Sequence, residues 1–140
     1  MKILQIIFLF SILTFPSFAG QAEIVVVVSA KSTVDNLDKD RVSAIFLGKT
    51  ATFPDGTQAI PVEQPEGTPP HEEFHTLVTE KSGSQLKSYW SKMVFSGKGN
   101  PPKEIANNAE MLKLITGNPN MIGYIDKSAV NSSIKIVFAP

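Results

Sequence analysis

A run of five consecutive β-branched residues, Ile24 to Val28, constrains the fold more than any other feature of the sequence. β-Branched side chains favour strands, and a run without polar alternation is typical of a strand that is covered on both faces. Such strands occur mainly in α/β proteins, in which helices pack on both sides of a sheet. A chain of 140 residues has room for one ordinary domain. We therefore predict a single α/β domain.

The N-terminal segment, residues 1–19, has the features of a secretory signal peptide. Lys2 precedes an apolar run, and Ser17 and Ala19 place small residues at positions −3 and −1 of a cleavage site. The apolar run is only about thirteen residues long, whereas a membrane-spanning helix needs about 20. We expect cleavage after Ala19, with Ala22 as a second option. This leaves residues 20–140 as the exported domain, with no membrane span after cleavage.

The sequence contains no cysteine, and its 13 basic residues balance its 13 acidic residues. Without cysteine there is no disulfide, no thiolate nucleophile and no cysteine-ligated metal centre. An exported protein without disulfides fits a bacterial periplasm. The balanced charge argues against a nucleic-acid partner, because nucleic-acid-binding domains usually carry a basic excess. We expect a periplasmic protein that binds no nucleic acid.

Capping residues and apolar spacing predict the other elements of the domain. Asp38 precedes apolar residues at helical spacing, as an N-cap does, and Pro61 favours a place near a sheet edge for its strand. The predicted helices cover residues 37–48, a segment that begins at Pro69 after the N-cap Thr68, residues 86–93, and a segment capped by Asn108. The further predicted strands cover residues 59–63, 122–125 and 134–138.

The only two histidines of the chain fall in the pattern His71-Glu72-Glu73-Phe74-His75. This is the H-E-x-x-H pattern of zinc proteases, in which two histidines one helical turn apart bind zinc and the glutamate acts as base. The enzyme also needs a third ligand. The extended motif would place it at position 81, which is Lys81, and the next predicted helix offers mainly apolar residues. We expect two histidines at the boundary of the core and no metal, with a zinc hydrolase as an alternative.

The strand predicted over residues 59–63 leads through a loop containing Gly67 and Thr68 into a helix N-terminus. Free amides and the helix dipole at such a place favour an anion, and α/β sheets bind ligands at this end of their strands. Four carboxylates crowd the same end and would repel an anion unless they point away. They are Glu63, Glu66, Glu72 and Glu73.

Several short segments recur in the order known from one family. They are Ile45-Phe46-Leu47-Gly48-Lys49, Phe53 with Asp55-Gly56, Ile60-Pro61-Val62, Gly97-Lys98-Gly99-Asn100, and Asn118-Pro119 followed by Ile122-Gly123-Tyr124-Ile125. Together they resemble the phosphate-binding proteins of bacterial ABC importers, over about residues 45–125. The resemblance covers the second lobe of that two-lobed design only. It implies a single lobe of a type 2 periplasmic-binding-protein-like fold, with a mixed sheet flanked by helices.

The resemblance also implies a function without catalysis or a cofactor. It suggests that phosphate or another small oxyanion binds at Gln64, Gly67, Thr68 and Lys98, in a role linked to ABC-type phosphate uptake. Gln64 stands where the family has an arginine, and Pro69 replaces a residue with an amide donor. The alternative is a ligand-free interaction or accessory module of an envelope complex. An envelope protein or a second copy would then supply the missing lobe.

Overall fold

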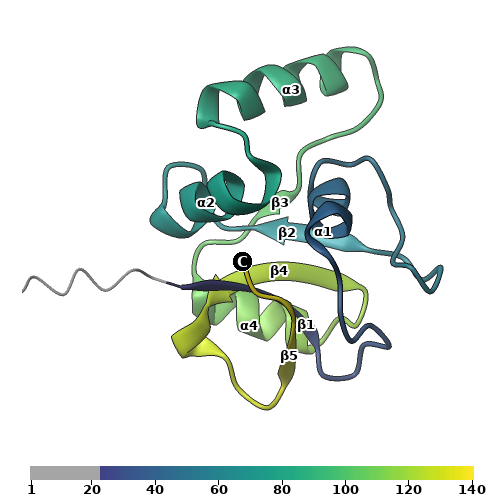
Figure 1. Cartoon of the computed structure of the whole chain (residues 1–140), viewed down its shortest axis with the longest axis vertical. Coiled ribbons are helices and arrows are strands. Elements are labelled where there is room, and N and C mark those ends of the chain that lie inside the picture. Colours follow the sequence, from purple (N-terminus) through teal and green to yellow (C-terminus); the bar gives the residue numbers. More distant parts are fainter. Residues whose placement is uncertain (1–22) are drawn as a thin grey trace, which may run out of the picture.

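The computed structural model describes residues 23–140, and the predicted signal peptide lies outside this range. Its centre is a five-stranded sheet in the order β3-β2-β4-β1-β5 (Figure 1). The strands are β1 (Ile24–Ser29), β2 (Ile60–Glu63), β3 (Lys103–Glu104), β4 (Met121–Asp126) and β5 (Ile134–Phe138). β1 runs antiparallel to both β4 and β5, whereas β2 runs parallel to both β3 and β4. The sheet is therefore mixed, as predicted.

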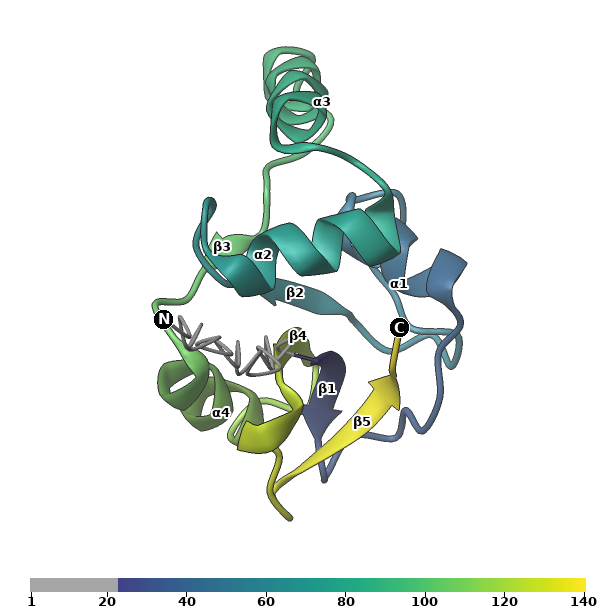
Figure 2. The ribbon, with the colours of Figure 1, turned by 60° about the vertical axis from the view of Figure 1, so that its left-hand side comes forward.

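The β-branched run forms β1, and all six residues of this strand are buried. Val26 and Val28 pack on the side of the sheet that carries α1 (Lys39–Phe46) and α2 (Pro69–Phe74). Val25 and Val27 pack with residues of α4 (Asn108–Thr116) on the other side (Figure 2). The strand is covered on both faces, which confirms the α/β prediction.

The predicted strands are all present, and β5 has the predicted bounds. β3 pairs only with the last two residues of β2, so Pro61 lies beyond that pairing and near the sheet edge, as expected. Asp38 is the N-cap of α1, and its side chain accepts from the Arg41 amide. The cap of α4 was predicted one residue too late, because Asn107 accepts from the Glu110 amide and Asn108 is the first helical residue.

Two short elements were not predicted from the sequence, β3 and the 3₁₀ helix η2 (Lys127–Ala129). The helix predicted from Pro69 continues beyond α2, but as the π-helical turn η1 (His75–Thr79). Glu80 ends η1 with a φ of 56°, and its amide donates to the carbonyl oxygen of His75. No local propensity marks a π turn, and β3 is too short to show an alternating pattern.

The helix α3 (Gly83–Phe95) stands away from the rest of the molecule (Figure 1). Ser82 and Gln85 form a capping box at its start, and Leu86 is its only buried residue. Tyr89 links it to the body by donating from its hydroxyl to the Leu47 carbonyl at 2.6 Å. The rest of its predicted apolar stripe is only half-buried, and Phe95 is 96% exposed. Across residues 23–140, no helix has the length and apolar character needed to cross a membrane.

Candidate functional site

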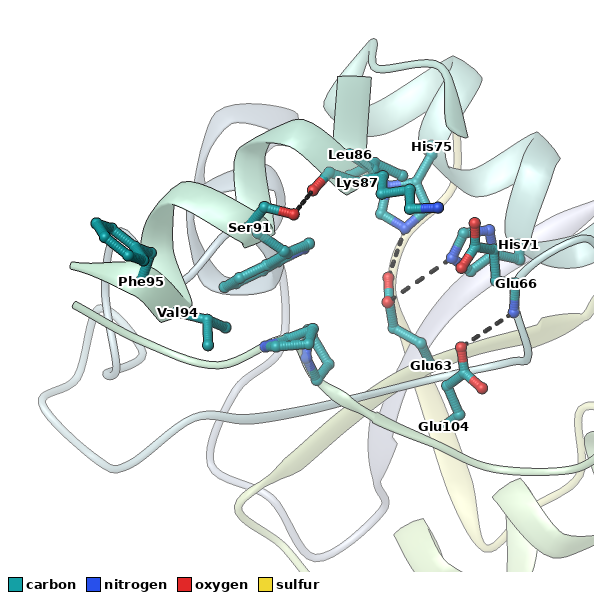
Figure 3. Close-up of a pocket in the computed structure, with 13 residues that line it drawn as sticks. Glu63, Glu66, His71, His75, Leu86, Lys87, Ser91, Val94, Phe95 and Glu104 are labelled. Carbon is teal, nitrogen blue, oxygen red and sulfur yellow. Dashed lines mark hydrogen bonds and ion pairs between the residues drawn. The ribbon is translucent and has the colours of Figure 1, made fainter. Parts of the chain in front are cut away.

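The end of β2 opens onto a cavity of about 630 Å³ between the sheet, α2 and α3 (Figure 3). Glu63, the last residue of β2, is buried and lines this cavity. Carboxylates and histidines lie at one end, and apolar residues of α3 form the opposite wall. The lining residues are Glu63, Glu66, His71, His75, Leu86, Lys87, Trp90, Ser91, Val94, Phe95, Pro101, Pro102 and Glu104.

His71 and His75 are buried, at 5% and 3% exposure, so the expectation of two boundary histidines is wrong. They lie one turn apart along α2 and the start of η1, with ring centroids separated by 4.5 Å. The helix follows β2 closely in the chain, and the Glu63 side chain at the end of that strand lies against both histidine rings. Helical projection alone does not show this, because it contains no information about the neighbouring strand.

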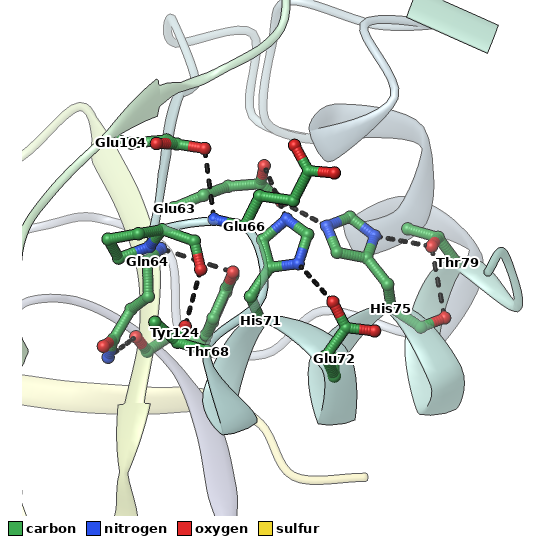
Figure 4. Close-up of polar contacts among 11 residues, drawn as sticks. Glu63, Gln64, Glu66, Thr68, His71, Glu72, His75, Thr79, Glu104 and Tyr124 are labelled. Carbon is green, nitrogen blue, oxygen red and sulfur yellow. Dashed lines mark hydrogen bonds and ion pairs between the residues drawn. The ribbon is translucent and has the colours of Figure 1, made fainter. Parts of the chain in front are cut away.

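Glu63 points toward both histidines (Figures 3 and 4). Its Oε1 lies 2.6 Å from His75 Nε2, and its Oε2 lies 3.9 Å from His71 Nε2. One ligand atom from each residue can be chosen so that all three lie within 4.8 Å of one another. The zinc-protease motif would take its third ligand from after His75, whereas the structure provides a carboxylate from before His71. The sequence signal was the position of Glu63 at the carboxyl end of a strand that leads into the histidine helix.

The predicted anion loop lies beside this cluster, and Gln64 and Thr68 both make internal hydrogen bonds. Gln64 is buried, and its Nε2 donates to Asn108 Oδ1 at 2.7 Å and to the Tyr124 carbonyl at 3.3 Å. Thr68 is at the N-cap position of α2 but makes no side-chain capping bond. Its hydroxyl donates instead to the Pro65 carbonyl at 2.6 Å. Gly67 has a φ of +82°, a conformation that glycine adopts without strain.

The buried Tyr124 contacts the backbone of Gln64. Its phenol oxygen accepts from the Gln64 amide at 3.3 Å (Figure 4). Its ring stacks on Phe74 with centroids 4.2 Å apart. Burial raises the pKa of the Tyr124 hydroxyl, and the negative charge of Glu63 raises it further. Tyr124 therefore stays a neutral phenol that fixes the backbone at the start of the loop.

The other predicted binding residue, Lys98, is exposed on the turn after α3 and does not line the cavity. The carboxylates around the loop point in different directions. Glu63 faces the histidines inside the cavity, whereas Glu72 does not line the cavity and has its Oε1 3.6 Å from His71 Nδ1. Glu104 of β3, which the sequence analysis did not single out, accepts from the backbone amide of Glu66 at 3.2 Å. One backbone amide of the loop is thus already hydrogen-bonded to a carboxylate oxygen.

Comparisons with known proteins identify the fold. No family model matches the chain, and neither does any curated protein. Among solved structures, an ABC-type phosphate transport receptor from Vibrio cholerae is similar to this chain at TM-score 0.65 and 16% identity. The match covers 82% of this chain and 45% of the receptor. A putative phosphate ABC transporter substrate-binding protein with bound phosphate, from Clostridium perfringens, is similar at TM-score 0.65 and 19% identity. The match covers 82% of this chain and 44% of that protein. PstS from Borrelia burgdorferi is similar at TM-score 0.62 and 12% identity, over 82% of this chain and 46% of PstS.

These matches place the chain in the structural class of periplasmic binding proteins. The chain spans less than half of the length of each of these three proteins, which corresponds to a single lobe. The resemblance to phosphate ABC transporter substrate-binding proteins is therefore confirmed at the level of the fold. These structural neighbours are substrate-binding proteins, not enzymes.

Proposed function

We propose that this chain is a periplasmic, non-catalytic oxyanion-binding domain that serves ABC-type phosphate uptake as a binding or sensing component. The observation that carries the proposal is the single-lobe fold shared with phosphate-binding proteins. The predicted signal peptide and the absence of cysteine support export to the periplasm. We place the anion at the loop before α2, with Gly67, Thr68 and Gln64 as contacts and Lys98 as an outer cation.

The same geometry indicates weak binding. Gln64 lacks the charge of an arginine, and its side-chain amide already donates within the protein. Pro69 and Pro70 remove two amide donors from the first turn of α2. The carboxylates of Glu66 and Glu104 line the adjoining cavity. We therefore expect a dissociation constant for inorganic phosphate of about 1 mM, which corresponds to about −4 kcal/mol.

Replacing Thr68 with alanine should weaken phosphate binding about tenfold. In the complex the Thr68 hydroxyl turns from the Pro65 carbonyl to the anion, and a hydrogen bond to a charged group contributes about 1.5–3 kcal/mol, part of which is offset by the bond given up. Isothermal calorimetry on the exported chain measures this directly. Thr76→Ala is the matched control, since Thr76 is exposed on η1 and lies outside the loop. No heat with the unaltered chain at millimolar phosphate, or equal affinities for the two variants, would contradict the proposed site.

A second function is supported by the exposed end of α3. Val94 and Phe95 are 51% and 96% exposed, and they border an open cavity with an apolar wall. Exposed apolar side chains beside an open cavity are typical of an interaction surface, so a second copy or an envelope protein is a fitting partner. In this second candidate function the chain is an interaction or accessory module, and its partner supplies the opposite wall of the cavity.

Phe95→Ala should abolish association if α3 is a docking surface, because an exposed aromatic residue is a typical interface anchor. Sedimentation equilibrium of the unaltered chain tests for a second copy, and capture from a periplasmic extract tests for an envelope protein. Thr68→Ala is the control and should leave association unchanged. A monomer that captures nothing, or a complex that Phe95→Ala leaves intact, would argue against this role.

A further inference from the structure

Glu63, His71 and His75 form a buried cluster whose chemistry the proposed oxyanion site does not use. All three side chains are at least nine-tenths buried, at 5%, 5% and 3% exposure. Among residues 23–140, the ion-pair partners of Glu63 are these two histidines, and no lysine or arginine pairs with it. We propose that the three residues bind a divalent transition-metal cation of the zinc class.

His75 is held between two polar side chains, with Glu63 beside its Nε2 and Thr79 beside its Nδ1. Thr79 Oγ1 lies 2.7 Å from His75 Nδ1 and 3.2 Å from the His75 carbonyl, and in one of the two tautomers that this geometry allows, the hydroxyl donates to the carbonyl and accepts from Nδ1–H. With the Nδ1 proton placed there, neutral His75 presents the Nε2 lone pair toward Glu63 Oε1, only 2.6 Å away. Two acceptors at this distance need a proton or a metal cation between them.

The position of His71 favours the metal over the proton. One proton between Glu63 and His75 leaves His71 Nε2 without a partner from the carboxylate, because 3.9 Å is too long for a hydrogen bond. A zinc ion with bonds of about 2.0–2.1 Å holds neighbouring ligand atoms about 3.3 Å apart in a tetrahedral site. The three ligand atoms already lie within 4.8 Å of one another, so metal binding would require rotation of the Glu63 carboxylate and the His71 ring to reach that spacing.

The far side of His71 adds a second, independent observation. Its Nδ1 is buried and has no hydrogen-bond partner within the described chain. The nearest carboxylate oxygen, Glu72 Oε1, lies 3.6 Å away on a half-exposed side chain that can move closer. A histidine that binds a metal through one ring nitrogen usually donates from the other to a carboxylate or carbonyl. Glu72 would play this orienting part for His71, as Thr79 does for His75.

The donor set fixes the class of cation. Two imidazole nitrogens and one carboxylate suit zinc, cobalt or nickel, and they do not suit calcium or magnesium, which prefer oxygen ligands. The three residues line the open cavity, so the metal has an entry path and room for a water molecule as fourth ligand (Figure 3).

Titration of the tag-free exported chain with Zn²⁺, in competition with a chromophoric chelator, tests the proposal. We expect one equivalent of Zn²⁺ with micromolar or tighter affinity. Glu63→Gln and His75→Gln should each lower the affinity at least 100-fold, since even an orienting partner contributes 10–100-fold. Co²⁺ in place of Zn²⁺ should give the intense visible absorption of a four-coordinate site. The assay contains no phosphate, so its outcome is independent of the oxyanion proposal.

Two threonines on η1 provide a matched pair of variants that keeps all three ligands. Thr79→Val removes the acceptor of His75 Nδ1 and should weaken Zn²⁺ binding about tenfold. Thr76→Val changes an exposed threonine on the same turn and should have no effect. The proposal would be overturned if the unaltered chain bound no Zn²⁺ at a concentration of about 100 μM, 100-fold above the expected dissociation constant. It would also be overturned by binding that folded Glu63→Gln, His75→Gln and Thr79→Val variants retain in full, because the ion would then lie elsewhere.

Discussion

Replacing Phe74 with alanine should lower the free energy of unfolding by about 3–5 kcal/mol, the usual cost of truncating a buried phenylalanine. Phe74 is fully buried and joins the helix of the candidate site to the sheet. Its ring stacks on Tyr124 at 4.2 Å and contacts Phe46 at 4.6 Å between centroids. Removing the ring leaves a cavity between α1, α2 and β4. Urea unfolding followed by circular dichroism measures the change.

The matched control for this prediction is Phe95→Ala. Phe95 is almost fully exposed, so the same chemical change there should alter stability by less than about 0.5 kcal/mol. A Phe74→Ala variant as stable as Phe95→Ala would show that α2 does not pack on the sheet through this ring. The position assigned to both histidines would then be wrong as well.

Gly123→Ala should destabilise the chain by about 1–3 kcal/mol through overpacking. A Cβ atom at Gly123 would lie 2.8 Å from Ile115 Cδ1, 2.8 Å from Met111 Sδ and 3.3 Å from Val62 Cγ2. These atoms belong to the core between the sheet and α4, so at least one side chain must shift out of its packed position. The midpoint of thermal unfolding is the appropriate measurement.

Gly83→Ala is the control for this second prediction. Gly83 is the first residue of α3, and a Cβ atom there would have nothing within 4 Å. Alanine also has the higher helix propensity, so this variant should be as stable as the unaltered chain or slightly more stable. A neutral result for Gly123→Ala would mean that α4 packs less closely on β4 than the structure shows.

The sheet and its order of elements were largely predictable, because the signals that determine them are local. The β-branched run of Ile24–Val28 required two covered faces, and it has them. Asp38 was identified as an N-cap from its side chain and the apolar spacing that follows, and it caps α1. Helix α3 was also predicted, but its exposed end was not, since periodicity shows a face without showing what covers it.

The candidate site was less predictable because it depends on contacts between elements. His71 and His75 were found by their spacing, yet their burial results from tertiary packing, which includes the contact with Glu63 at the end of β2. Glu63 was noted only as one of several carboxylates, and its contact with both histidines is a tertiary feature. Thr68 occupies the predicted cap position, but its hydroxyl donates to Pro65, a choice that depends on the turn geometry.

The central functional claim is that a small oxyanion binds at the loop before α2. Amide correlation spectra of the exported chain, recorded by nuclear magnetic resonance during titration with inorganic phosphate, test it residue by residue. We expect saturable shifts at Gly67 and Thr68 with a midpoint near 1 mM, and none with sodium chloride at equal ionic strength. Unchanged Gly67 and Thr68 signals throughout the phosphate titration, or shifts confined to residues outside this loop, would contradict it.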